Sequence, residues 1–402
     1  MTFELSDAEI RQTLARGKEL AATVALPTAT SERPSIVEMT ALFYSAHDAE
    51  ALRGAAVERR GARAYELETF SPLYLTNTCE SECKMCGMRR GNRDLDRQTA
   101  SPSQIQRQLE ILAGRGVWAV GLLTGEYRRE TRDWSIALTR DALRRALVLG
   151  FRHVLINIGS LDESELAELL ADVPRDGDGR TAPKVTLCTF QETYDLDSYR
   201  RFMGEDPDNP RADFDRRLRN FDRAASAGMR VVNPGVLLGL CRDPAYEVVA
   251  LSLHVRHLLS RGLEVYVSVP RLRQASGADN GRGVSDDEFV RLVAILSMGM
   301  PEAKIVITTR ECSEIQRRVL PMVSVLSAGS SAVAPYTESG ARFPLEASQF
   351  EVIDQRPFEE ILGEFTAAGV RFENYDSSQE PGLSRVGCAV ARRWCEPRGR
   401  EL

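Results

Sequence analysis

Short apolar runs alternate with longer amphipathic stretches along the chain from about residue 68 onward. Several runs are apolar on both faces, as in "VWAVGLLT" and "KIVITT", which is typical of parallel strands covered by helices. The alternation of strand and helix patterns predicts stacked βα units. The predicted strands number eight and cover residues 73–77, 117–124, 154–158, 185–190, 231–238, 265–269, 305–309 and 323–326.

The helices between these strands carry their own start signals. Ser101 is placed as an N-cap, Pro102 falls at the first helical position, and Gln104 completes a capping box. Ser285 and Glu288 repeat the arrangement before "FVRLVAIL". These signals predict that one helix begins after Ser101 and another after Ser285.

Eight such units predict an α/β fold, a (β/α)8 TIM barrel, with a doubly wound sheet as the alternative. We expect the barrel to span residues 69–341. Residues 1–68 have helical faces rich in Ala, Arg and Glu and predict an N-terminal helical extension. Residues 342–402, with the helix pattern "PFEEILGEFTAAG", predict a short C-terminal α/β tail that packs on the barrel. Polar loops rich in Gly and Pro are expected to be surface excursions or lids at 175–183, 205–213 and 276–283.

Composition narrows the class of protein. The 402 residues are 43% hydrophobic and 27% charged, and no apolar run is long enough to span a bilayer, which argues against a membrane role. The net charge of -6 comes without a basic block, so no nucleic-acid partner is expected. The N-terminal "MTFELSDAEIRQ" lacks the basic start and apolar run of a secretory signal, so we expect a cytoplasmic protein.

Three of the eight cysteines cluster in "NTCESECKMC", at the spacing Cys79-x3-Cys83-x2-Cys86. They follow the first predicted strand, so we expect them at the C-terminal mouth of the barrel, where active sites of this fold lie. A [4Fe-4S] cluster has four irons, and three thiolates leave one iron open to an external ligand. Zinc is the alternative, but it would want a fourth Cys or His nearby, and the four histidines lie away from this loop.

The segment resembles the CxxxCxxC motif of radical S-adenosylmethionine (SAM) enzymes. In that family, SAM chelates the fourth iron through its amino and carboxylate groups, and an electron from the cluster cleaves SAM to a 5'-deoxyadenosyl radical. The resemblance implies one [4Fe-4S] cluster and SAM, with Met85 standing where the family usually has an aromatic residue. The segments "LLTGEY", "TFQETY", "RRLRNFDRAASAG" and "NPGVLLGL" are similar to SAM-binding segments of the family. They imply SAM contacts by Thr124, Gly125, Glu126, Glu192, Arg217 and Val236.

Within that family, residues 69–376 resemble the aromatic amino acid lyases, and most of all the tryptophan lyase branch that makes 3-methyl-2-indolic acid for nosiheptide-type thiopeptides. The resemblance implies hydrogen abstraction from the amino group of L-tryptophan, cleavage of the Cα to carboxyl carbon bond, and migration of the carboxyl group to indole C2. It implies that Arg310 in "TTRE" holds the substrate carboxylate, and that Ser327 and Tyr74 contact the substrate. It also implies an external one-electron reductant such as flavodoxin or ferredoxin.

Other interpretations remain. Tyrosine or another aromatic amino acid fits the same motifs, and a non-catalytic barrel stabilised by a metal would carry the same cysteines. Singly, the site residues have structural explanations: Arg310 as a partner of Glu311, Glu192 as an acid at a helix N-terminus, and Arg217 as a solvated helix residue. Together, in order and at successive strand ends, they favour a SAM site. No role is predicted for the C-terminal pair Cys388 and Cys395.

Overall fold

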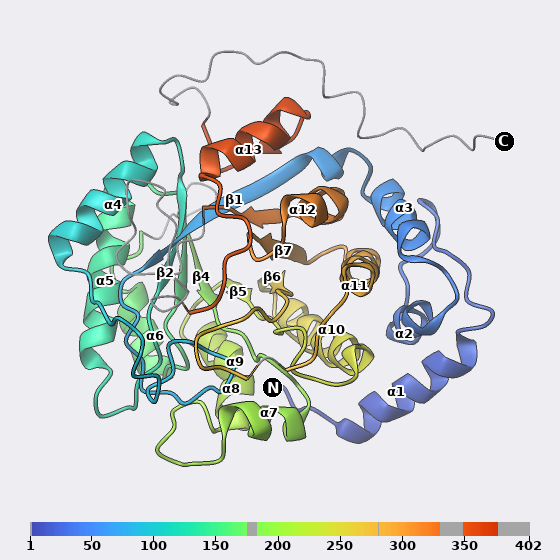
Figure 1. Ribbon diagram of the computed structural model, residues 1–402, viewed down its shortest axis with the longest axis horizontal. Helices are drawn as coiled ribbons and strands as arrows, with labels where there is room; N and C mark the ends of the chain where they lie inside the picture. The colour runs from blue at the N-terminus through green and yellow to red at the C-terminus, as the bar shows by residue number, and fades with distance from the viewer. Residues whose placement is uncertain (1, 175–182, 280, 330–348, 377–402) are drawn as a thin grey trace.

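A closed barrel of parallel strands forms the centre of the molecule (Figure 1). The computed structural model describes residues 2–174, 183–279, 281–329 and 349–376. The barrel strands are β1 (Glu66–Tyr74), β2 (Ala119–Leu123), β3 (His153–Asn157), β4 (Lys184–Cys188), β5 (Val231–Asn233), β6 (Glu264–Ser268), β7 (Lys304–Thr308) and β8 (Val325–Ser327). Consecutive strands pair in parallel, and β1 pairs with both β8 and β2. The predicted (β/α)8 barrel is confirmed, and the doubly wound alternative is wrong because such a sheet stays open.

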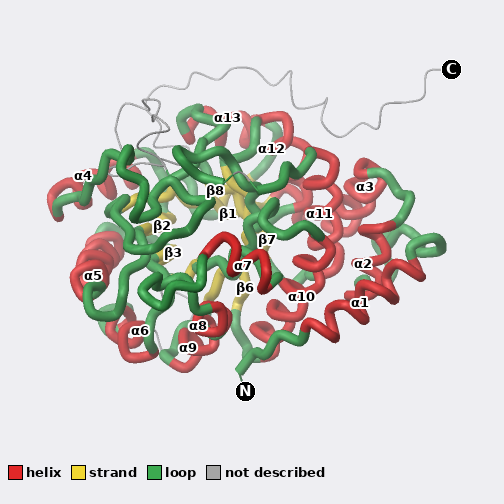
Figure 2. Tube along the Cα trace, turned by 60° about the horizontal axis from the view of Figure 1, so that its bottom comes forward, coloured by secondary structure: helices red, strands yellow, loops and turns green. Residues whose placement is uncertain are grey.

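Helices surround the barrel, with α4 to α6 on one side and α10 to α12 on the other (Figures 1 and 2). The helices α1 to α3 pack outside α10 and α11 rather than on the strands. Among the described residues we find no helix with the length and hydrophobicity that a bilayer-spanning segment requires. The helices are α1 (Asp7–Leu20), α2 (Ile36–Tyr44), α3 (Ala49–Arg60), α4 (Pro102–Gly114), α5 (Asp133–Val148), α6 (Glu163–Leu170), α7 (Leu196–Met203), α8 (Phe214–Leu218), α9 (Asn220–Ser226), α10 (Pro244–Ser260), α11 (Asp286–Gly299), α12 (Ser313–Val319) and α13 (Phe358–Ala367), with the 3-10 helices η1 (Gly61–Tyr65) and η2 (Leu320–Met322).

Capping residues set where α4 and α11 begin. The hydroxyl of Ser101 accepts the N–H of Gln104, and the side chain of Gln104 accepts the N–H of Ser101 in return. Ser285 accepts the N–H of Glu288 in the same way. Both predicted helix starts are confirmed, and each such cap stabilises its helix by about 1 kcal/mol.

A polar cluster fills the lower end of the barrel, at the amino ends of the strands. Glu68 on β1 accepts the hydroxyl of Tyr266 at 2.7 Å and the ammonium group of Lys304. Lys184 and His153 lie 3.8 Å and 3.6 Å from the same carboxylate. Burial opposes ionisation of Glu68, but the hydrogen bond with His153 and the charge of Lys304 lower its pKa. Because these residues come from five strands, they meet inside the barrel and close this end.

This cluster also explains why β1 begins at Glu66, well before the apolar run at 73–77. The first half of β1 carries Glu66, Glu68 and Thr69. A strand segment with so many polar residues does not stand out as an apolar run in the sequence, so the pattern predicted only its later part. The other seven strands begin within about two residues of the predicted starts. However, β5 ends at Asn233 because Pro234 cannot donate a ladder hydrogen bond.

The described part of the C-terminal tail contains α13 and β9 (Arg371–Phe372). The predicted helix in "PFEEILGEFTAAG" is confirmed as α13. β9 pairs in parallel with the start of β1, with Arg371 opposite Glu66. Residues 175–182, 330–348 and 377–402 lie outside the described residues, and with them most of one predicted loop and both Cys388 and Cys395.

Candidate active site

A cavity opens at the carboxyl ends of the barrel strands. The last residue of every barrel strand lines it: Tyr74, Leu123, Asn157, Cys188, Asn233, Ser268, Thr308 and Ser327. Its volume is about 1470 Å³ counted out to the open mouth. The carboxyl ends of all eight barrel strands therefore converge on this one cavity.

The three clustered cysteines lie on this cavity, in the loop between β1 and α4. The sulfur of Cys79 accepts the backbone N–H groups of Ser81 at 3.4 Å and Glu126 at 3.3 Å, so the backbone fixes its orientation. Among the described residues, no three His, Cys, Asp or Glu side chains are placed to hold one metal ion. A cubane cluster needs a wider arrangement, because each of its irons takes one thiolate. Three thiols are one short of the four ligands of a closed zinc site, whereas they can serve three irons of a cluster and leave the fourth open.

Burial governs the ionisation of these thiols. It raises the pKa of Cys79 and Cys83, and it raises the pKa of Cys86 to about 11. The neighbouring thiols shift the pKa of Cys83 and Cys86 further in the same direction, because a second negative charge nearby disfavours ionisation. Binding of a metal centre must therefore release protons from these thiols.

The cysteine loop presses against the end of β2 at Gly125. A Cβ atom on this residue would lie 2.1 Å from the carbonyl oxygen of Thr78 and 2.7 Å from the Cα of Cys79, so only glycine fits. The carbonyl of Glu126 accepts the N–H of Glu80 at 3.0 Å. The turn after β2 thus holds the cysteine loop through its backbone, which leaves the carboxylate of Glu126 at the cavity wall.

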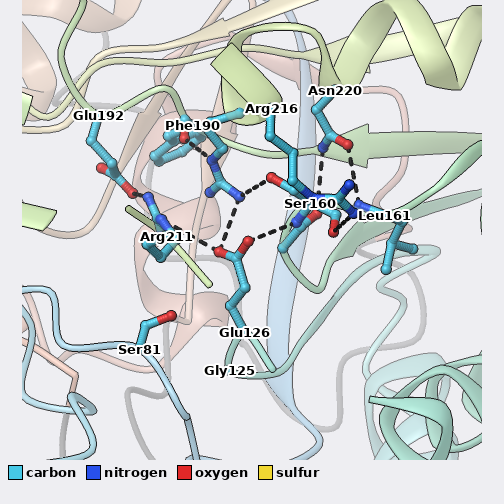
Figure 3. Close-up of polar contacts among 12 residues, drawn as sticks. Ser81, Gly125, Glu126, Ser160, Leu161, Phe190, Glu192, Arg211, Arg216 and Asn220 are labelled. Carbon is cyan, nitrogen blue, oxygen red and sulfur yellow. Dashed lines mark hydrogen bonds and ion pairs between the residues drawn. The ribbon is translucent and has the colours of Figure 1, made fainter. Parts of the chain in front are cut away.

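The carboxylate of Glu126 is held from two sides (Figure 3). Its Oε1 accepts the N–H of Ser160 at 2.9 Å, and its Oε2 accepts Nη1 of Arg217 at 3.1 Å. Gly159 makes room for it, since a Cβ there would lie 2.5 Å from the Cγ of Glu126. Arg217 also donates to the carbonyl of Phe190 at 2.8 Å, and burial lowers its pKa. The explanation of Arg217 as a solvated helix residue is therefore wrong.

Glu192 follows β4 in the left-handed conformation, with φ of 71°, alone among the described non-glycine residues. Its N–H donates to the carbonyl of Gly235 at 3.3 Å, and its carbonyl accepts the N–H of Leu237 at 2.8 Å. Its carboxylate pairs with Arg211 at 2.8 Å. Such strain costs about 1–3 kcal/mol and concentrates at functional sites. The explanation as a helix-terminal acid does not hold, because α7 uses Asp195 as its cap.

Val236 is the one predicted site residue that does not line the cavity. It lies beside Glu192 in the backbone pairing, but its side chain is buried in the main hydrophobic core. Successive side chains of an extended backbone point to opposite faces, so Leu237 lines the cavity instead. The contact with SAM predicted for Val236 is better placed on Leu237.

Arg211 lines the cavity between Glu192 and Glu126, although no site role is predicted for it (Figure 3). Its Nε forms an ion pair with Glu126 at 3.3 Å but makes no hydrogen bond. Burial acts to lower the pKa of Arg211, but the negative groups Cys83, Glu192 and Glu126 outweigh it and raise that pKa. Arg211 is therefore a cation at the cavity.

The loop that carries Arg211, residues 205–213, is not a free surface excursion. The side-chain amide of Asn209 donates to the carbonyl of Met203, and its oxygen accepts the N–H of Glu82 from the cysteine loop at 3.3 Å. Asn209 therefore ties the loop to both α7 and the predicted metal site. These contacts join segments that lie far apart in the sequence. The only sign of them in the sequence is that Asn209 is a polar residue in a short stretch between two prolines.

Arg310 lies across the cavity at the end of β7, and no carboxylate of the described residues pairs with it. Glu311 instead pairs with Arg271 and Arg273, so the alternative ion pair between Arg310 and Glu311 is wrong. The guanidinium of Arg310 stacks on the ring of Phe350, with 3.4 Å between its carbon and the ring centroid. Burial lowers the pKa of Arg310. A half-buried cation that no carboxylate of the described residues neutralises indicates a site for an anionic ligand.

Tyr74 and Ser327 complete this wall of the cavity. Ser327 ends β8 in register with Thr308 of β7, and Tyr74 ends the neighbouring β1. Tyr74 is buried, which raises its pKa, and its hydroxyl donates to Oε1 of Gln349 at 2.5 Å. The three predicted substrate contacts thus share one wall, and their roles remain predictions.

Further polar groups on the cavity were missed by the sequence analysis. Buried side-chain atoms of Ser81, Asn233 and Arg273 have no hydrogen-bond partner in the described structure. Buried polar groups are normally paired, so these atoms are candidate ligand contacts. In the sequence, Asn233 is a polar residue within the predicted strand 231–238, and Arg273 comes shortly after the predicted strand 265–269.

Glu247 on α10 is a buried carboxyl that supports the loop after Glu192. It accepts the hydroxyl of Thr193 and the N–H of Tyr194, the latter at 3.0 Å. Burial raises the pKa of Glu247 from 4.5 to about 7. The folded chain then keeps a proton that the unfolded chain loses, so the free energy of unfolding falls as pH rises through this window.

We expect the wild type to lose about 3 kcal/mol of stability as pH rises from about 4.5 to about 7, with no further loss from this group above that. Glu247→Gln should lack this loss, because an amide does not titrate. Urea unfolding of both chains at about pH 5 and about pH 8 measures it. Glu58→Gln, at an exposed site, is the matched control. Parallel pH profiles for wild type and Glu247→Gln would contradict the prediction.

The fold and this site define a (β/α)8 barrel with a cavity at the carboxyl ends of its strands and a cysteine loop beside it, and the chain has relatives in both sequence and structure. Residues 268–371 match the family of the Biotin and Thiamin Synthesis associated domain. The chain is 27% identical over 318 residues to 2-iminoacetate synthase of Escherichia coli strain K12, which covers 77% of this chain and 78% of that protein. The same enzyme of Salmonella typhimurium is 25% identical over 316 residues, with the same coverage.

Solved structures extend the comparison. HydG, a maturase of the FeFe-hydrogenase, is similar with a TM-score of 0.77 and 26% identity over 93% of this chain and 81% of that chain. HydG from Carboxydothermus hydrogenoformans gives a TM-score of 0.72 and 26% identity, covering 90% and 78%. Methylornithine synthase shares the fold, with a TM-score of 0.61 and 17% identity over 92% of this chain and 94% of that chain.

Proposed function

We propose that this protein is a radical SAM lyase that acts on an aromatic amino acid, with L-tryptophan as substrate and 3-methyl-2-indolic acid as product. The observation that carries the proposal is the cavity itself. It joins three cysteines at one side to Arg310 at the other, a half-buried arginine that pairs with no carboxylate in the part of the chain that the structure describes. The similarity to 2-iminoacetate synthase and HydG supports the class of enzyme.

One [4Fe-4S] cluster is held by Cys79, Cys83 and Cys86, and its fourth iron takes SAM. Two observations fit this assignment: backbone N–H groups point at the sulfur of Cys79, and the thiols are close enough to raise each other's pKa. When bound, the cluster and SAM supply a 5'-deoxyadenosyl radical, using one electron from an external donor such as flavodoxin or ferredoxin.

The residues around Glu126 and Glu192 suit the amino acid end of SAM. That end is a zwitterion, which needs acceptors for its ammonium and a donor for its carboxylate. Glu126 and Glu192 offer the acceptors, together with Thr124 and the backbone at Gly125. Arg217 is held by hydrogen bonds to Glu126 and Phe190, whereas the side chain of Arg211 makes one, to Glu192, and keeps its Nε free of hydrogen bonds, so we propose Arg211 as the donor. Met85 and Leu237 form the apolar wall for adenine.

The wall of Arg310, Ser327 and Tyr74 binds the amino acid substrate. The guanidinium fork of Arg310 pairs with the substrate carboxylate, and Ser327 and Tyr74 orient the substrate beside it. Apolar residues face the space next to them and suit an indole ring, namely Phe70, Leu155 and Val306. The hydrogen leaves the substrate amino group, the carboxyl group moves from Cα to indole C2, and the bond from Cα to Cβ also breaks, so the β-carbon remains as the methyl group of the product. Cα and the nitrogen depart together as methanimine, once an electron from the external donor and a proton replace the abstracted hydrogen.

Tyrosine as substrate is the second candidate. The relatives named 2-iminoacetate synthase support it, because 2-iminoacetate keeps the carboxyl group on its original carbon. A chain of that type would break the bond from Cα to Cβ and leave the bond from Cα to the carboxyl carbon intact. The two candidates therefore differ in product as well as in substrate.

Anaerobic incubation of the reconstituted protein with SAM, a reductant and either amino acid tests the function. Mass spectrometry should detect 5'-deoxyadenosine and 3-methyl-2-indolic acid with tryptophan. Formation of 2-iminoacetate from tyrosine alone would replace the tryptophan assignment with the second candidate. A colourless protein that binds zinc and does not cleave SAM would instead indicate a non-catalytic barrel.

A further inference from the structure

Gln349 lies at the mouth of the cavity and is bonded to the cysteine loop. Its carbonyl accepts the N–H of Gly87 at 2.9 Å, directly after Cys86. Its side chain hydrogen-bonds the Cys86 thiol, and its Oε1 accepts the hydroxyl of Tyr74 at 2.5 Å. Gln349 is therefore fixed to both the predicted metal site and the predicted substrate wall.

Phe350, the next residue, contacts the opposite side of the cavity. Its ring stacks under the guanidinium of Arg310, with 3.4 Å between the guanidinium carbon and the ring centroid. The donors of a guanidinium lie in its plane, so a ring below that plane orients the group without using its N–H bonds. An acidic partner would also fix Arg310, but it would occupy the donors that a substrate carboxylate needs. Phe350 thus orients Arg310 and leaves it free to bind.

We propose that Phe350 is the positioning residue for Arg310 and that Gln349 anchors Phe350 to the cysteine loop. This inference rests on the proposed function, because it assigns the substrate carboxylate to Arg310. It adds that one short segment, Gln349–Phe350, sets the position of the substrate relative to the cluster. A substrate held at the wrong angle would leave its amino hydrogen out of reach of the radical.

The test compares Phe350→Leu with Phe350→Tyr, which keeps the ring, and with Ile353→Ala, an exposed change in the same segment. We expect Phe350→Leu to raise the KM for the aromatic amino acid about tenfold, since a desolvated stacking contact contributes on the order of 1–2 kcal/mol. The amount of product per SAM cleaved should also fall. Phe350→Tyr and Ile353→Ala should stay within about twofold of wild type, and iron content and SAM affinity should be unchanged in all three.

Several outcomes would overturn the inference. An unchanged KM in Phe350→Leu would do so, as would equal damage in Phe350→Leu and Phe350→Tyr, or loss of iron in Phe350→Leu. Gln349→Leu keeps the backbone bond but loses the acceptor for Tyr74, so we expect a severalfold higher KM and a changed EPR signal of the reduced cluster. If Gln349→Leu keeps the wild-type KM and the wild-type EPR signal of the reduced cluster, Gln349 does not anchor Phe350 to the cysteine loop.

Failure of the proposed function is distinguishable from failure of this inference. If the wild-type protein turns over no aromatic amino acid, the proposed function is wrong. In that case, anaerobic calorimetry with L-tryptophan still compares wild type with Phe350→Leu. Weaker binding by Phe350→Leu alone would support the positioning role, and equal binding by both chains would overturn it.

Discussion

A chain carrying Cys83→Ala is expected to bind almost no iron and to cleave no SAM. Cys83 is buried between Met85 and Leu237 on the cavity, and one thiolate per iron leaves no substitute when it is removed. After anaerobic reconstitution, the wild type should contain about four irons per chain and the variant nearly none. Iron analysis and the visible absorption of the cluster measure the difference.

Cys312→Ala is the matched control for this experiment. Cys312 is a free cysteine at the start of α12 and does not line the cavity. Its removal should leave iron content and SAM cleavage at the wild-type level. Full iron content in Cys83→Ala would show that the three-cysteine loop does not hold the cluster, and about eight irons in the wild type would reveal a second one.

Arg310→Ala is expected to abolish product formation while iron content and SAM binding stay intact. Removing one partner of a desolvated charge pair typically costs about 2–5 kcal/mol, so kcat/KM should fall by about 30-fold to several thousandfold. Arg310→Lys keeps the charge but loses the planar fork, and we expect it to restore only part of the activity. Anaerobic kinetics with product detection, together with equilibrium binding of SAM, separate the two effects.

The exposed Arg219→Ala serves as the control for the loss of a positive charge. It should behave as the wild type in every assay. If Arg310→Ala turns over the amino acid at an unchanged rate, Arg310 has no place in the substrate site. If Arg310→Ala also loses its iron, the residue supports the fold of the site instead of binding the substrate.

The barrel was predictable because its strands are buried on both faces, so the hydrophobic pattern alone marks them. The start of β1 could not be predicted, because Glu66 and Glu68 give it the composition of a loop. Only the structure shows that Glu68 belongs to the polar cluster at the amino ends of the barrel strands. The end of β5 follows from Pro234, whose effect a hydrophobic pattern does not weigh. Local signals such as the Ser101 cap located the helices because capping depends on neighbours in the sequence.

The site was predictable where function depends on residues close in sequence. The cysteine spacing and the strand-end segments located all predicted site residues on the cavity except Val236. Arg211 was missed because Asn209, through contacts with distant segments, turns its loop inward. Gln349 and Phe350 were missed for the same reason, since their partners lie far away in the chain.

The polar cluster of Glu68, Tyr266 and Lys304 closes the barrel at the amino ends of its strands. Among the described residues, the cavity then opens only at the carboxyl ends of the strands. For two ligands that bind one above the other in such a cavity, we expect the deeper one to enter first and to leave last. The closed amino end of the barrel would in this way set an order of binding, far from any atom that reacts.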